Sequence, residues 1–280
     1  MMNREIIVKR SRVLGFCMGV RRAMRIVEDL IATEKSGPVC TIGPLIHNQQ
    51  VLSELESKGV HRIDDPLDAV SGTVVIRAHG LPPSERRVLE GKGLKLIDAT
   101  CPRVITSQRI VAEYSAKGYQ VVIIGDRDHG EVKGLAGFAS ACAVVQSRAE
   151  AERFSFSGKT VVIAQTTLRP EDYADICSII KVKDPDVEIV MSICSATRER
   201  QESLFELLKD VDALVVVGGK NSANTVRLFE IAKNSGKPSW HIEVPEELPE
   251  EIWNYRSIGL TAGASTPDWL IDAVEARIKG

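Results

Sequence analysis

The chain has 280 residues, of which 44% are hydrophobic, and its 36 basic and 38 acidic residues give a formal net charge of -2. This length fits one large domain or two to three small ones, and the composition is that of an ordinary globular protein. Near-balanced charge argues against a dedicated nucleic-acid-binding protein. The first residues, MMNREIIVKRSRVLGF, lack the apolar core of a secretion signal, and no apolar run reaches membrane-helix length. We therefore expect a soluble cytoplasmic protein that acts on neither nucleic acid nor membrane and keeps its cysteines reduced.

Short apolar runs alternate with helix-like segments along the whole chain, which indicates an α/β fold with largely parallel sheets. After an N-terminal strand or extension in residues 1–12, a strand-like run ends at Cys17 and a helix begins (VLGFCMGVRRAMRIVEDL). The same arrangement recurs around Cys101 (LKLIDATCPRVITSQRIVAEY) and Cys194 (EIVMSICSATRERQESLFELL), at spacings of 84 and 93 residues. Such recurrence indicates an internal repeat.

The segments that follow each cysteine repeat as well. An apolar run ending in glycine comes first (to Gly43, Gly125 and Gly219), then a polar loop, a helix and a short strand. A last strand then leads into a polar turn and a proline that opens a helix, in GTVVIRAHGLPP, KTVVIAQTTLRP and SIGLTAGASTPD. We therefore predict three α/β repeats, at 13–94 (with the N-terminal strand 1–12), 95–186 and 187–280.

The three cysteines occupy the same place in each repeat. Ligands bind at the loops that follow the carboxyl ends of parallel strands, and each repeat offers three such loops. If the repeats form a trefoil around a pseudo-threefold axis, these loops point into one central cavity. Cys17, Cys101 and Cys194 are therefore predicted to converge there.

Three thiolates at helix N-termini form a metal-binding set. A cubane iron–sulfur cluster usually takes four cysteines, so three leave one iron open to water or substrate. That arrangement suits the removal of a hydroxyl group by one-electron steps. The alternative is a three-thiolate zinc site, which could hydrolyse but not reduce.

Polar side chains of the predicted cavity are suited to phosphate. Helix N-termini at Asn48, Glu131 and Ser222 add backbone N–H groups and the positive end of the helix dipole. The side chains that we assign to a phosphate or diphosphate site are His47, His79, His129, Thr166, Ser222, Asn224 and Ser265. Ser222 and Ser265 could also be simple helix caps, a role compatible with phosphate binding.

Glu131 is the one carboxylate in this set. Reductive loss of hydroxide needs one proton for the leaving water and another for the allyl anion that remains. We predict that Glu131 donates protons, directly or through Thr166. The alternative is an acidic residue that stabilises the first turn of its own helix.

Two further groups of residues have ordinary explanations. Arg21, Arg22, Arg198 and Arg200 follow two of the cysteines and are interpreted as a solvated helix face, with a docking surface for an acidic electron-transfer protein as the alternative. Cys40, Cys142 and Cys177 lie within strand-like or helix-like runs and are interpreted as core residues.

The order of motifs resembles one known family. GFCMGV, HNQQV, RAHG, DATCP, HGEVKG, QTT, SIC with AT-x-x-RQ, KNSAN and TAGASTP occur as in the hydroxymethylbutenyl diphosphate reductases, the LytB (IspH) family. The resemblance spans nearly the whole chain. It implies three α/β domains around a [4Fe-4S] cluster that Cys17, Cys101 and Cys194 hold with one open iron. It also implies that this cluster can degrade to [3Fe-4S] in air.

The resemblance also implies the reaction and its residues. The allylic diphosphate substrate would be converted to isopentenyl and dimethylallyl diphosphate, the last step of the non-mevalonate pathway, with electrons from ferredoxin or flavodoxin. Glu131, Thr166 and His129 would be catalytic. The substrate-binding residues would be His47, His79, His129, Thr166, Thr167, Ser222, Asn224 and Ser265.

The chain departs from the family pattern at a few positions. Ala223 stands where a second serine is common, and Thr106 and Gln108 stand where many relatives have lysine and histidine. Two rival functions remain besides the zinc hydrolase: an enzyme of the same architecture acting on another phosphorylated alcohol, and a non-catalytic iron–sulfur sensor. A sensor would need an output surface such as a basic DNA-reading helix.

Overall fold

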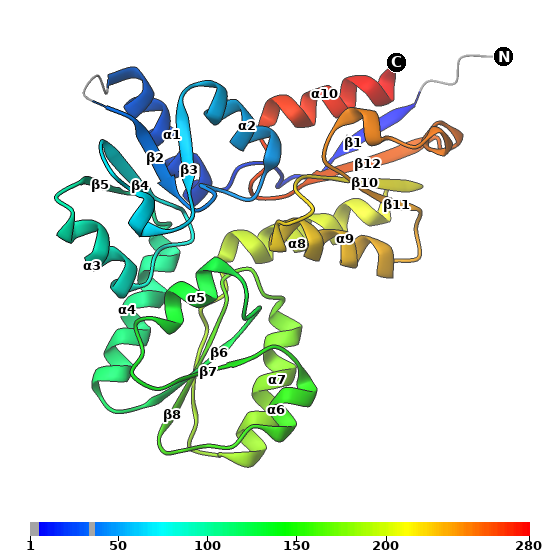
Figure 1. Ribbon diagram of the computed structural model, residues 1–280. Coiled ribbons are helices and arrows are strands. Elements are labelled where there is room, and N and C mark those ends of the chain that lie inside the picture. Colours follow the sequence, from blue (N-terminus) through cyan, green and yellow to red (C-terminus); the bar gives the residue numbers. More distant parts are fainter. Residues whose placement is uncertain (1–5, 34–36) are drawn as a thin grey trace. The chain divides into compact units, whose positions relative to one another are not determined.

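The computed structural model describes residues 6–33 and 37–280, whose strands form three four-stranded sheets (Figure 1). All neighbouring strands within each sheet run parallel. In spatial order, the first sheet contains β3 (Val60–Ile63), β2 (Val39–Ile42), β4 (Thr73–Ile76) and β5 (Lys95–Asp98). The second contains β7 (Cys142–Val145), β6 (Gln120–Ile124), β8 (Thr160–Ala164) and β9 (Glu188–Val190). The third contains β11 (Ser239–Ile242), β10 (Ala213–Val217), β12 (Ser257–Ala262) and β1 (Ile7–Arg10).

Helices connect these strands. The α-helices are α1 (Met18–Thr33), α2 (Gln49–Ser57), α3 (Pro83–Gly91), α4 (Pro102–Ala116), α5 (Gly130–Ala136), α6 (Arg148–Arg153), α7 (Pro170–Lys183), α8 (Ser195–Lys209), α9 (Ala223–Asn234) and α10 (Asp268–Lys279). Short 3-10 helices lie at Pro66–Asp68, Pro245–Glu247 and Glu250–Asn254. Among the helices of these residues, none has both the length and the apolarity to cross a membrane.

The central strands are apolar throughout because both faces of each sheet are covered. Every residue of β10 (ALVVV) and of β8 (TVVIA) is buried. In the second sheet, Val122 and Ile124 face a core that α7 shares, whereas Val121 and Ile123 face a core formed with α4 and α5. In the third sheet, alternate residues of β10 likewise pack toward α10 and toward α8 and α9.

The strand orders confirm the threefold repeat and the α/β fold class. The orders β5-β4-β2-β3, β9-β8-β6-β7 and β1-β12-β10-β11 match position by position. In each sheet the strand that leads to a cysteine is an edge strand beside the strand that carries the polar turn. The sequence pattern predicted the elements, and the sheet pairing shows how each repeat is joined to the one before it.

The pairing corrects the predicted place of the N-terminal strand. Sequence analysis assigned it to the first repeat, but β1 pairs with β12, with Ile7 opposite Ser257. Similarly, β5 and β9 pair with β4 and β8 rather than opening the next sheet. Each sheet is thus completed by a strand that precedes the next cysteine, a non-local pairing that periodicity does not reveal. Residues 1–5 of the predicted segment lie outside the described residues, and the boundaries 13–94, 95–186 and 187–280 remain predictions.

The chain divides into two compact units. Unit 1 consists of Met1–Arg21, Ile46–Glu54 and Ser195–Gly280, and among its described residues it holds the sheet of β1, β12, β10 and β11. Unit 2 consists of Arg22–Leu45 and Leu55–Cys194 and holds the other two sheets.

Candidate functional site

Each of the three predicted ligand cysteines directly precedes a helix. Cys17 precedes α1, Cys101 is the N-cap of α4, and Cys194 precedes α8. All three cysteines are partly exposed. These placements confirm the predicted helix N-termini.

The backbone N–H of each cysteine is anchored in the same way. Cys17 donates to the carbonyl oxygen of Ala264 at 3.2 Å, and Cys101 donates to that of Ala78 at 2.9 Å. Cys194 donates to the carbonyl oxygen of Thr166 at 3.0 Å. The three acceptors all lie in the polar turns TAGAST, RAHG and QTT that follow β12, β4 and β8. The repeat therefore extends to the hydrogen bonds that position the cysteines.

The other three cysteines occupy different environments. Cys177 is buried in α7, and burial raises the pKa of its thiol to about 11, so the core interpretation holds for it. Cys40 lies half-buried in β2. Cys142 is exposed at the start of the edge strand β7, so the core interpretation is wrong there. These cysteines serve as internal controls because they lie outside the three equivalent turns.

Glu131 is a buried carboxylate with two partners from one residue. It lies in the first turn of α5, and only 2% of its surface is exposed. Its Oε1 accepts a hydrogen bond from the backbone N–H of Thr166 at 2.7 Å, and its Oε2 accepts from the Thr166 hydroxyl at 2.8 Å. Burial raises the pKa of Glu131 to about 6, while the bonds from Thr166 act in the opposite direction. A carboxyl group in this environment can carry a proton near neutral pH.

The two predicted histidines of unit 2, His79 and His129, lie side by side. The rings of His79 and His129 meet edge to face, with centroids 5.2 Å apart. His129 is the N-cap of α5, and its Nδ1 accepts a hydrogen bond from the backbone N–H of Glu131 at 3.2 Å. The Nε2 atom of His129 is then the nitrogen that carries the proton in the neutral ring. His129 therefore positions Glu131 as well as presenting a donor of its own.

Gln165 joins the turn after β8 to the loop after β6. Its Oε1 accepts a hydrogen bond from the backbone N–H of Asp126 at 2.9 Å. Its Nε2 donates to the hydroxyl oxygen of Thr167, also at 2.9 Å. A methyl group at Gly125 would lie 2.7 Å from Cβ of Gln165, so this close approach requires glycine. Thr167, predicted to bind substrate, is thus held by Gln165 of its own turn, which the neighbouring loop in turn contacts.

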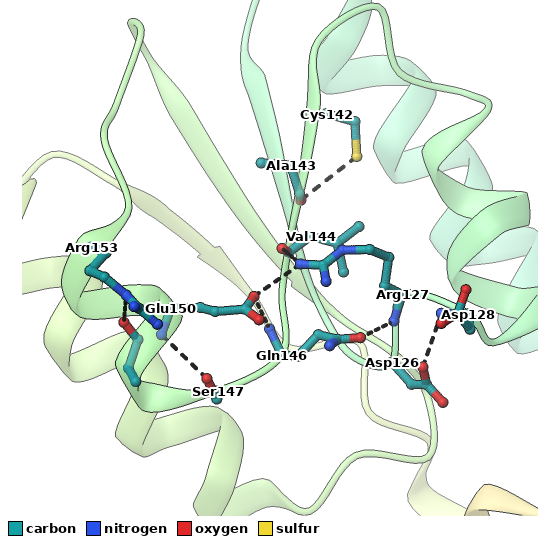
Figure 2. Close-up of polar contacts among 11 residues, drawn as sticks. Asp126, Arg127, Asp128, Cys142, Ala143, Val144, Gln146, Ser147, Glu150 and Arg153 are labelled. Atoms are coloured by element: carbon teal, nitrogen blue, oxygen red, sulfur yellow. Dashed lines mark hydrogen bonds and ion pairs between the residues drawn. The ribbon is translucent and has the colours of Figure 1, made fainter.

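The loop that carries His129 is also fixed from its other side, as Figure 2 shows. The backbone N–H of Arg127 donates to Oε1 of Gln146 at 2.5 Å. The guanidinium of Arg127 donates to Oε2 of Glu150 at 3.0 Å and to the carbonyl oxygen of Val144 at 3.1 Å. The loop is therefore tied to the edge strand β7 and to α6 before it reaches α5.

Unit 1 gathers a second polar group around the N-terminus of α9. Ser222 caps this helix by accepting from the backbone N–H of Thr225 at 3.5 Å. The hydroxyl of Ser265 donates to the carbonyl oxygen of His47 at 2.9 Å and lies 3.4 Å from the Ser222 hydroxyl. Asn48 caps α2 by accepting from the backbone N–H of Val51 at 3.1 Å. The predicted helix ends at Asn48 and Ser222 are thus present.

Asn224 has a buried side-chain donor without a protein acceptor. Only 5% of its surface is exposed, and its Nδ2 has no hydrogen-bond partner among the described residues. A buried amide donor that lacks an acceptor is costly unless a ligand supplies one. A phosphate oxygen would supply it, so the donor chemistry of this helix end fits an anion.

Sequence reasoning missed Arg77, the first residue of the RAHG motif. Its Nε donates to the carbonyl oxygen of Gly80 at 3.4 Å, and burial lowers the pKa of its guanidinium. Methyl groups at Gly43 and Gly130 would lie 2.1 and 2.9 Å from its terminal nitrogens, so two glycines leave room for it. The motif was read for His79 alone, although a cation two residues earlier was an available signal.

The comparison with protein families decides the assignment. A family model described as LytB protein matches residues 8–279. The chain belongs to the LytB family. This membership confirms the resemblance that the motifs indicated.

Relatives within the LytB family match over nearly their full length. The 4-hydroxy-3-methylbut-2-enyl diphosphate reductase of Treponema denticola is 45% identical over 98% of this chain and 99% of its own. The protein of that name from Aquifex aeolicus is 39% identical over 95% of this chain and 93% of its own. The solved E-1-hydroxy-2-methyl-but-2-enyl-4-diphosphate reductase of Plasmodium falciparum matches with a TM-score of 0.91 at 30% identity, covering 96% of this chain and 86% of that chain.

Proposed function

We propose that the chain is a 4-hydroxy-3-methylbut-2-enyl diphosphate reductase of the non-mevalonate pathway. The supporting observation is the equivalent anchoring of Cys17, Cys101 and Cys194, each by its N–H to a polar turn. The reaction takes up a pair of electrons and a pair of protons, breaks the allylic C–O bond and releases water. Isopentenyl and dimethylallyl diphosphate are its products. The names of the LytB relatives agree with this assignment.

Cys17, Cys101 and Cys194 would hold the iron–sulfur cluster. Three partly exposed cysteines, each directly before a helix, fit a cluster with thiolate ligands. When bound, a [4Fe-4S] cluster with three cysteine ligands supplies electrons one at a time and offers one open iron. Its conversion to [3Fe-4S] in air is part of the same proposal, because the iron without a cysteine ligand is held least firmly.

Glu131 would supply protons, with Thr166 as its partner. The carboxyl group is buried, its pKa lies at about 6, and both oxygens are held by Thr166. A fixed carboxyl that exchanges a proton near neutral pH suits general acid catalysis. His129 caps the same helix turn and would contribute to both proton transfer and substrate binding.

The predicted diphosphate-binding residues belong to the same proposal. In unit 1 the buried Nδ2 of Asn224 and the N-terminus of α9 offer hydrogen bonds that a phosphate oxygen can accept. The complete predicted set is His47, His79, His129, Thr166, Thr167, Ser222, Asn224 and Ser265. Ala223, in the first turn of α9, lacks the hydroxyl that many relatives have there.

Electron delivery by ferredoxin or flavodoxin and a cytoplasmic location belong to the same proposal. The departures at Thr106 and Gln108 lie on α4, the helix that follows Cys101, where they can alter turnover or the choice of electron donor.

The decisive experiment is anaerobic purification followed by iron, sulfide and visible-absorption measurements. The protein is then mixed with the hydroxymethylbutenyl diphosphate and a reduced viologen. Near four irons per chain and substrate-dependent viologen oxidation would support the proposal. A colourless zinc protein would favour the hydrolase, and a brown protein inert to this substrate would favour a sensor or another phosphorylated alcohol.

Cysteine variants then test the ligand assignment. Serine replacements of Cys17, Cys101 and Cys194 are expected to lower bound iron and abolish reduction, because serine is a poor ligand for this cluster. Serine replacements of Cys40, Cys142 and Cys177 are matched controls and should keep parental iron content. Iron loss in a control, or its retention in a ligand variant, would contradict the assignment.

A further inference from the structure

Arg200 lies on α8 and contacts the backbone just before Cys17. Only 2% of its surface is exposed. One Nη atom donates to the carbonyl oxygen of Gly15, and the other donates to that of Ala196 at 3.3 Å. Gly15 has a positive φ of 74°, so its carbonyl belongs to a turn that few other residues could form. The helix that begins after Cys194 thus holds the turn that leads to Cys17.

A second residue of α8 anchors the same segment. Ser203, 1% exposed, has its hydroxyl oxygen 2.7 Å from that of Ser11. It also accepts a hydrogen bond from the backbone N–H of Val13 at 3.1 Å. The backbone N–H of Cys17 donates to the carbonyl oxygen of Ala264, so hydrogen bonds anchor the segment 11–17 at both of its ends. Arg200 is the last of these side-chain contacts before the cysteine.

Arg22 makes the corresponding contact from α1. It follows Cys17 by five residues, as Arg200 follows Cys194 by six. Its two Nη atoms donate to the carbonyl oxygens of Thr100 and Asp98, each at 3.2 Å. These carbonyls immediately precede Cys101. In both cases a guanidinium on the helix after one cysteine holds the backbone before another.

The third helix has no such arginine contact among the described residues. At the corresponding positions α4 carries Thr106 and Ser107, whose hydroxyls donate to carbonyl oxygens of their own helix. The segment before Cys194 is instead held by Ser192, whose hydroxyl accepts from the backbone N–H of Ala164 and donates to its carbonyl oxygen, both at 2.7 Å. An arginine therefore anchors the backbone before two of the three cysteines, Cys17 and Cys101.

We propose that Arg22 and Arg200 are positioning residues that fix the backbone before Cys101 and Cys17 for cluster binding. A guanidinium has several donors in one rigid plane and can bind two carbonyls at once, which lysine cannot do in the same geometry. Its positive charge also lies close in sequence to a thiolate-bearing turn. The inference rests on the proposed function, since it concerns ligands of the proposed cluster.

The test compares Arg22→Met and Arg200→Met with neighbours on the same helices. Arg21 and Arg198 are exposed and make surface ion pairs, with Asp268 at 3.6 Å and with Glu202 at 3.8 Å. Arg21→Met and Arg198→Met therefore remove the same charge from the same helices. The readouts are the rate of iron release to a chelator under anaerobic conditions, the midpoint potential of the cluster, and the unfolding temperature of the cluster-free protein.

Loss of an outer contact to a metal ligand typically weakens metal binding about 10-fold or more. We expect Arg22→Met and Arg200→Met to release iron about 10-fold faster and to shift the potential. The two controls should stay within about twofold of the parent protein. Parental release rates in both test variants would overturn the inference while leaving the proposed function intact. Failure of the parent protein to assemble a cluster would overturn the proposed function and the inference together.

A second measurement covers the case in which a methionine variant does not fold. In cluster-free Arg22→Lys and Arg200→Lys, backbone amide exchange is followed in residues 98–101 and 11–17. Faster exchange confined to the segment that each arginine contacts is expected. Unchanged exchange in both segments would overturn the positioning role.

Discussion

Thr166 contacts Glu131 and Cys194 at the same time. Its N–H and hydroxyl donate to the two carboxylate oxygens of Glu131, at 2.7 and 2.8 Å, and its carbonyl oxygen accepts from the N–H of Cys194 at 3.0 Å. One residue of the QTT turn therefore ties the proposed proton donor to a proposed cluster ligand. A change at Thr166 should affect both proton transfer and the metal site.

Glu131→Gln should abolish proton donation while preserving the fold. The amide oxygen can still accept from the Thr166 N–H, but the group can no longer deliver a proton. We expect kcat to fall by about 10² to 10⁴. Iron content should match the parent protein, and that measurement separates a catalytic defect from a metal defect. Parental turnover would remove Glu131 from the mechanism.

Glu131 should also make stability depend on pH in a definite direction. Its pKa is raised from 4.5 to about 6 in the folded state, so the unfolded chain ionises more readily. The contribution of Glu131 to the free energy of unfolding is fully present below pH 4.5 and is lost as pH rises through 6. Unfolding free energies at both ends of this range should show a loss of about 2 kcal/mol that is missing in Glu131→Gln. The same pH dependence in both proteins would contradict the assignment.

Thr166→Val should shift the pH dependence of turnover. The hydroxyl of Thr166 lowers the pKa of Glu131, so its removal should raise that pKa further. A general acid is active when protonated, and activity should therefore persist to higher pH than in the parent protein. Thr166→Ser, which keeps the hydroxyl, is the matched control. The measurement is the pH profile of kcat/KM for the parent protein and the two variants. A shift of the Thr166→Val profile to lower pH would contradict the prediction.

His129 should stabilise α5 as a cap independently of catalysis. Asparagine can accept the Glu131 N–H in place of Nδ1, whereas alanine cannot. Chemical denaturation should show a loss of about 1 kcal/mol for His129→Ala and a much smaller loss for His129→Asn. Equal losses would mean that the hydrogen bond contributes nothing to stability.

Two substitutions at the N-terminus of α9 should change KM in opposite directions. Ser222→Ala removes both the helix cap and a predicted diphosphate donor, so KM should rise about 10-fold or more. Stability should fall by about 1 kcal/mol. Ala223→Ser adds the hydroxyl that relatives commonly have, and should lower KM without a change in stability. An unchanged KM in both variants would remove this helix end from the substrate site.

Local sequence signals predicted the strands, the helix starts at the cysteines and the polar turns. They did not predict that β5 and β9 complete the sheets of the strands before them, or that β1 completes the sheet of β10, β11 and β12. Hydrophobic periodicity identifies a strand but does not say which strand it pairs with. The hydrogen bonds from Cys17, Cys101 and Cys194 to the polar turns follow from that pairing. The sequence could therefore not predict these hydrogen bonds either.

The arginines that follow Cys17 and Cys194 show a second limit of prediction from sequence. All four near Cys17 and Cys194 were interpreted as a solvated helix face, which is correct for the exposed Arg21 and Arg198. It is wrong for Arg200, which is buried, and for Arg22, which is half-buried. Charge alone predicts exposure, and only the carbonyl oxygens of turns from other repeats explain why two of the four point inward.

The pairing of β1 with β12 has a consequence for biosynthesis. Ile7–Arg10 is synthesised about 250 residues before its partner strand Ser257–Ala262, as their positions in the chain show. At about 5 to 20 residues per second, the early strand waits roughly 10 to 50 s for its neighbour. Unit 2, whose strands lie between these ends, can form its sheets during that interval. The sheet that holds β1 can close only after β12 has been translated, and a nascent chain stalled before β12 would expose β1 without its partner strand to chaperones.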